Sequence, residues 1–65
     1  MTYRRSVRRE LVRAKTQVRG LAVHIARASE KYTPEEYPDI AQAFETIKEL
    51  LVHCDILIDE LLLII

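Results

Sequence analysis

The first half of the chain carries one narrow stripe of apolar residues. Its members recur at alternating steps of four and three, so that each turn of an α-helix presents one of them on the same face. They are Val7, Leu11, Ala14, Val18, Leu21, Ile25, Ala28 and Tyr32. Gly20 lies within this stretch without shifting its phase, so we expect it to weaken the helix by about 1 kcal/mol without ending it. The pattern predicts a helix over about residues 3–31.

The second half has a broader apolar pattern, in which three columns each repeat every seven residues. The columns are Ile40, Ile47, Cys54 and Leu61; Ala43, Leu50, Leu57 and Ile64; and Phe44, Leu51, Ile58 and Ile65. Three apolar columns are typical of a helix that packs against more than one neighbour, as in a bundle. We therefore predict a second helix that ends near residue 64, with Cys54 buried in it as a small hydrophobic residue.

Two positions compete for the start of this second helix. Thr33, Pro34 and Glu36 form a capping box with proline at the first helical position, which starts the helix at residue 34. Pro38 removes a hydrogen bond from the first turns of such a helix, so it either kinks the helix or marks its true beginning. The turn spans about residues 32–37, and a link this short makes the helices antiparallel neighbours.

These elements predict an all-α protein, a single helical-hairpin domain over residues 1–65 that dimerises into a four-helix bundle. A lone pair of helices covers only part of the second helix's apolar surface, and a large uncovered apolar patch usually marks an interface. A two-fold pair of hairpins closes the bundle. The predicted oligomer interface comprises Phe44, Leu51, Ile56, Ile58, Leu62, Leu63 and Ile65. The alternatives are a monomer with an exposed apolar tail, a higher oligomer, and a hetero-complex that docks an unknown protein on the apolar C-terminal turns.

Charge is divided sharply between the two halves. Residues 1–31 hold nine Arg/Lys and two Glu, and residues 32–65 hold one Lys and eight Asp/Glu, so a net charge of zero hides halves of +7 and −7. One interpretation is that these charges pair across the helices and fix their antiparallel orientation. Another is that the outward Arg5, Arg9, Arg13 and Arg19 bind the phosphates of a nucleic acid. A basic helix lying on an anionic lipid surface is a third.

The sequence offers little for catalysis. His53 and Cys54 are adjacent, which places their side chains about 100° apart on a helix instead of on one face. His24 is expected far from both. A single glycine leaves no glycine-rich phosphate loop, and two helices supply no enclosed pocket of their own. We therefore expect no enzyme activity, no cofactor and no metal site.

No signal peptide or membrane span is expected. The start of the chain is charged and lacks an apolar segment. The longest apolar run, Leu61–Ile65, is far shorter than the ~20 residues that a membrane helix needs. A single cysteine fits a reducing compartment, so the prediction is a cytoplasmic protein.

The plan of the chain resembles the Rop-type plasmid copy-number regulators. The stretch Glu36-Tyr37-Pro38-Asp39-Ile40, followed by Phe44 and Cys54, is similar to the opening of the second helix in that family. The resemblance implies short hairpins that dimerise into four-helix bundles, in which the first helices of the dimer bind paired RNA loops. In this chain the first helix is the basic one.

The function predicted from these features is that of a small non-enzymatic structural or regulatory protein, which interacts through a homodimeric helical bundle. The first alternative is a nucleic-acid-binding regulator that uses the arginine-rich face of the first helix. The second is a subunit of a hetero-complex.

Overall fold

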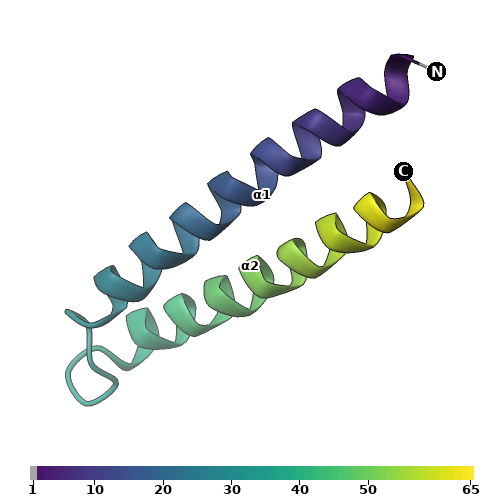
Figure 1. The fold of residues 1–65 in the computed structure, drawn as a ribbon. Helices are drawn as coiled ribbons and strands as arrows, with labels where there is room; N and C mark the ends of the chain where they lie inside the picture. Colours follow the sequence, from purple (N-terminus) through teal and green to yellow (C-terminus); the bar gives the residue numbers. More distant parts are fainter. Residues whose placement is uncertain (1) are drawn as a thin grey trace.

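The computed structural model describes residues 2–65 and contains two α-helices, α1 (Thr2–Ser29) and α2 (Pro38–Ile64). They run antiparallel, so the two ends of the chain lie at the same end of the molecule (Figure 1). The hairpin is a rod with extents of 53 × 15 × 11 Å. The prediction of an all-α helical hairpin is confirmed. α1 also continues through Gly20 without a break, as the phase of the stripe requires.

The turn between the helices is built by short-range hydrogen bonds. The amides of Glu30, Lys31 and Tyr32 each donate to the carbonyl three residues earlier, at 3.1–3.3 Å, and so close the last turn of α1. A single helical turn follows, in which the Tyr37 amide donates to the Thr33 carbonyl at 2.8 Å. The segment from Thr33 to Glu36 is therefore an isolated turn and not the start of α2.

Proline explains why α2 begins at Pro38 and not at Pro34. Pro38 has no N–H to donate, and it disfavours the helical conformation at the residue before it. Tyr37 accordingly has φ −135° and ψ 66°, outside the helical region. The expected capping box at Thr33 does not start the helix, and the second of the two starts that the sequence allows is the one that forms. No side chain caps α2 at Tyr37.

One face of each helix forms the contact between them. On α2 it comprises eight residues at alternating steps of three and four, here called the inner stripe: Ala41, Phe44, Lys48, Leu51, Asp55, Ile58, Leu62 and Ile65. They are the only residues of the 38–65 segment that are not exposed. The α1 side comprises Leu11, Ala14, Lys15, Val18, Ala22, Ile25, Ala28 and Ser29. The contact is shallow, because Ile58, still 8% exposed, is the only buried residue among residues 3–65.

Aromatic rings close the contact at the turn. The ring of Tyr32 stacks on Phe44, with centroids 5.7 Å apart, and meets Tyr37 edge-on at 5.3 Å. Such pairs each contribute about 0.5–1.5 kcal/mol beyond the area they bury. The two tyrosines that flank the turn thus cap this end of the hairpin.

The hairpin leaves an unusual amount of surface exposed. It has 5417 Å² of accessible surface at a mass of 7.6 kDa. A compact monomer of that mass exposes about 4,300 Å². The difference arises because two helices bury only one face each. Within residues 2–65, neither helix is apolar over enough of its length to cross a membrane.

Candidate interaction surfaces

Contacts between charged groups cross one side of the hairpin. The Lys15 ammonium lies against the carboxylates of Asp59 and Asp55, with Lys15 Nζ 3.6 Å from Asp55 Oδ1. Arg19 Nε lies 3.8 Å from the same Asp55 oxygen. Nearer the termini, Arg8 donates to the backbone carbonyl of Leu62 at 3.0 Å. This last contact satisfies one of the carbonyls that the C-terminal turn of α2 leaves without a helical partner. The opposite charges of the two helices therefore meet within one chain.

Lys15 and Asp55 are the least exposed charged groups of this network. Their side chains are 18% and 29% exposed, and both belong to the interhelical contact. Arg19, by contrast, remains 67% exposed. The cation at the centre of this network is Lys15, which lies against both Asp55 and Asp59. It lies beside the apolar stripe, where its long aliphatic stem can pack while the ammonium reaches the acids of α2.

The four arginines predicted to bind phosphates, Arg5, Arg9, Arg13 and Arg19, fall into two groups in the structure. Arg19 is held at Asp55, whereas Arg5, Arg9 and Arg13 are exposed and form no ion pair within residues 3–65. Arg5, Arg9 and Arg13 are spaced four residues apart, so they are neighbours along the outer surface of α1. Three like charges at this spacing repel one another by a few tenths of a kcal/mol per pair. The hairpin itself does not neutralise them.

A second apolar stripe follows α2 on its exposed surface. Its members repeat at alternating steps of three and four, and each stands one position before a member of the inner stripe. This outer stripe comprises Ile40, Ala43, Ile47, Leu50, Cys54, Leu57, Leu61 and Ile64. All eight residues are exposed, Leu50 to 63% and Ile64 to 77%. The outer stripe contains no charged residue, whereas the inner stripe that faces α1 contains Lys48 and Asp55.

Cys54 belongs to this outer stripe, so the prediction that it is buried is wrong for the single chain. Its thiol is exposed. The physical reason is that its column lies about 100° around α2 from the column of Asp55, which faces α1. The residues that share its column, Ile40, Ile47 and Leu61, are exposed as well.

The outer stripe shares one side of the hairpin with part of α1. On α1, Val7 and Ala14 each precede a residue of the charged side, Arg8 and Lys15, by one position. On α2, Cys54 and Leu61 likewise precede Asp55 and Leu62. A step of one residue turns about 100° around a helix. Val7 and Ala14 on α1, and Cys54 and Leu61 on α2, therefore lie on the side of the hairpin opposite to the charged groups. The α1 column is Val7, Ala14, Leu21 and Ala28, in which Val7 and Leu21 are 40% and 48% exposed. We call this side, with the outer stripe, the apolar face.

The structure places the residues predicted to form an oligomer interface in two different settings. Phe44, Leu51, Ile58, Leu62 and Ile65 belong to the inner stripe, where they pack against α1 within the chain. Ile56 and Leu63 are 47% and 88% exposed, on the part of α2 that faces away from the apolar face. The outer stripe is the surface that this selection missed. Its signal in the sequence is the second uninterrupted heptad pattern, one residue out of step with the first.

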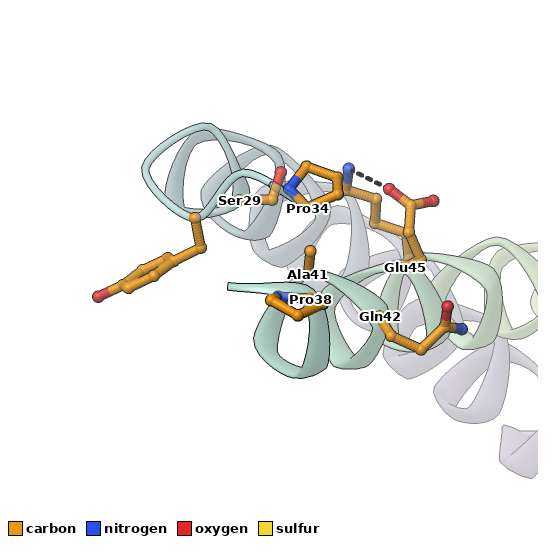
Figure 2. A pocket seen from close by; sticks show the side chains of 8 residues that line it. Ser29, Pro34, Pro38, Ala41, Gln42 and Glu45 are labelled. Atoms are coloured by element: carbon orange, nitrogen blue, oxygen red, sulfur yellow. Dashed lines mark hydrogen bonds and ion pairs between the residues drawn. The ribbon is translucent and has the colours of Figure 1, made fainter. Parts of the chain in front are cut away.

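Two shallow hollows lie on the charged side. The larger, about 390 Å³, sits at the turn between Pro34, Pro38 and the Lys48–Glu45 pair, whose Nζ and Oε1 atoms are 3.1 Å apart (Figure 2). The smaller, about 170 Å³, lies between Val18 and Ile56. Both are open to solvent. Neither contains a histidine or cysteine, and no group of three metal-ligating side chains occurs within the described part of the chain.

Comparison with known proteins adds no assignment: no protein-family model, no curated protein and no solved structure matches this chain.

Proposed function

We propose that the protein is a non-enzymatic interaction module that acts as a homodimer, with the apolar face of each hairpin covered by that of a second copy. The observation that carries this proposal is the distribution of apolar residues on α2. The stripe that faces α1 contains Lys48 and Asp55, whereas the fully apolar stripe faces solvent. A helix that packed only within its own chain would gain more by turning its fully apolar stripe inward.

The exposed area and the charge balance favour a second copy as the occupant. The hairpin exposes about 1,100 Å² more than a compact monomer of its mass, and a stable dimer buries about 800 Å² on each partner. The chain has a formal net charge of zero, so two copies approach without net repulsion. A two-fold pair also presents the same apolar face from both partners, which makes the contact self-complementary.

The experiment that tests this proposal compares two lysine substitutions on α2 by sedimentation at micromolar concentration. Leu50→Lys places a charge in the middle of the outer stripe, and it is expected to convert a dimer into a 7.6 kDa monomer. Leu63→Lys changes a more exposed leucine, 88% against 63%, outside that stripe, and it should leave the dimer intact. A monodisperse monomer for the unsubstituted protein contradicts the proposal. If only Leu63→Lys dissociates the dimer, the interface lies on the C-terminal turns and not on the outer stripe.

A second candidate function is binding of a nucleic-acid backbone by α1. It is favoured by the exposed Arg5, Arg9 and Arg13, whose charges no acid of the described chain neutralises. Arginines that contact phosphates release counterions, so such binding weakens steeply with salt and depends little on base sequence.

The test of this second function is the double substitution Arg5→Glu with Arg9→Glu. A binder should shift RNA or DNA in a gel at low salt, lose that shift in the double variant, and keep its helical circular dichroism and melting temperature. If the arginines act only in charge pairing, nucleic acid stays unbound throughout and the substitutions lower the melting temperature instead. Arg27→Glu with Lys31→Glu, two exposed changes near the turn, reverses the same number of charges and is the matched control.

A further inference from the structure

We infer that the second copy lies with its turn at the opposite end of the bundle, so that α2 packs on α2 and α1 packs on α1. This inference rests on the homodimer proposed above and specifies its geometry. It follows from the side chains that each helix points away from the hairpin plane on the side of the apolar face.

The two helices present different chemistry to a neighbour across this face. On α2, the residues one position before Phe44, Leu51, Ile58 and Ile65 point away from the hairpin plane. They are all apolar: Ala43, Leu50, Leu57 and Ile64. On α1, the residues one position before Leu11, Val18, Ile25 and Tyr32 occupy the equivalent place. They are all polar: Glu10, Gln17, His24 and Lys31.

This difference separates the two possible two-fold arrangements. If both turns lie at the same end, α1 of each copy covers α2 of the other. The levels of the helices, given by the contacts from Arg8 to Leu62 and from Lys15 to Asp55, then set Glu10 between the partner's Leu57 and the partner's Leu61. Gln17 and His24 come near the partner's Leu50 and Ala43. Covering polar groups with apolar ones costs free energy, because their hydrogen bonds to water are lost.

With the turns at opposite ends, apolar residues meet apolar residues and polar residues meet polar ones. The sizes of the α2 side chains then select one register. Ala43 faces the partner's Ile64, and Leu50 faces the partner's Leu57. Each layer fills well, since a small residue meets a large one or two leucines meet. A shift by one heptad leaves either Ala43 or Ile64 with no residue of the partner's column facing it.

The same register also brings complementary groups together on α1. The two-fold axis crosses α2 between residues 53 and 54, which is level with residues 16 and 17 of α1. Glu10 then lies beside the partner's His24, and Gln17 lies beside the partner's Gln17. In the column nearer the bundle centre, Ala14 faces the partner's Leu21, which again pairs a small residue with a large one. Both α1 columns are thus compatible with the register that the α2 column selects.

The test uses single-cysteine variants, which the chain permits because Cys54 is its only cysteine. In a Cys54→Ser background, Ala43→Cys is mixed with a mass-tagged Ile64→Cys and treated with a short bis-maleimide. The arrangement with turns at opposite ends predicts efficient cross-linking of this pair. A second mixture, Ala43→Cys with tagged His24→Cys, is expected to give little product. Those two positions lie about 27 Å apart along the bundle at 1.5 Å per residue.

The outcomes separate the geometry from the dimer itself. Cross-linking of the Ala43/His24 mixture in preference to the Ala43/Ile64 mixture overturns the orientation and leaves the homodimer standing. Failure of both mixtures, with a monomeric Cys54→Ser protein in sedimentation, overturns the homodimer as well. Failure of both mixtures in a protein that sediments as a dimer places the interface elsewhere and refutes the inferred register. Each variant is first checked for helical content and unchanged sedimentation.

Discussion

At the scale of single residues, Asp55 shows why the less apolar stripe of α2 faces α1. Its Oδ1 atom is buried and lies 3.6 Å from Lys15 Nζ and 3.8 Å from Arg19 Nε, too far for a direct hydrogen bond. The nearby cations stabilise this carboxylate, but the loss of water around its buried oxygen costs free energy and offsets part of that stabilisation. Asp55 therefore acts mainly by determining which face of α2 packs against α1, because Lys15 lies on the side of α1 where Asp55 can reach a cation.

Removing the charge of Asp55 should weaken the hairpin. We expect Asp55→Asn to lower the free energy of unfolding by about 1 kcal/mol, since Lys15 keeps only Asp59 and Arg19 loses its acid. The measurement is urea unfolding followed by circular dichroism. The loss should shrink in 1 M salt, where the Debye length falls to about 3 Å and the partly exposed pairs of the unsubstituted protein are already screened.

The control for this change is Glu49→Gln. Glu49 is an exposed acid of α2 that makes no ion pair within residues 3–65, so its neutralisation should alter stability little. Equal losses for the two substitutions would mean that the total negative charge of α2 matters and the contact with Lys15 does not.

At the scale of the elements, the sequence predicts where the helices lie, but it does not predict which face of α2 turns toward α1. Steps of three and four predict both helices, and the restriction that Pro38 places on Tyr37 explains where α2 begins. Rotation about the axis of α2 was harder to predict because two complete heptad stripes lie side by side on it. Apolar content alone favours the outer stripe as the contact with α1.

In the structure, the carboxylate of Asp55 determines which stripe faces α1. The same rotation of α2 explains why the predicted oligomer interface and the predicted burial of Cys54 differ from what is observed. With Asp55 turned toward Lys15, Phe44 and Ile58 pack inside the chain, and Cys54 and Leu50 turn outward. No motif in the sequence marks Lys15 as the partner of Asp55, because their pairing depends on the level at which the helices meet. That level is set by the length and shape of the turn.

At the scale of the whole molecule, the shape of the hairpin limits what it can do alone. A rod 11 Å thick, in which Ile58 is the only buried residue among residues 3–65, has almost no interior. Burial of apolar surface is the main favourable term in folding, so a chain that buries so little gains little from closing on itself. Pairing of the apolar faces would supply the missing interior and couple folding to assembly.

Coupled folding and assembly make thermal stability depend on concentration. For a dimer of two 65-residue chains that unfolds to separate chains, an unfolding enthalpy of about 0.7 kcal/mol per residue gives a rise of about 5 °C in melting temperature for each tenfold increase in concentration. Calorimetry or circular dichroism from 1 to 100 μM would measure it. Leu50→Lys, if it dissociates the dimer, should melt lower and at a temperature that concentration does not change. A melting temperature of the unsubstituted protein that is constant over this range would show that the single hairpin is the folding unit.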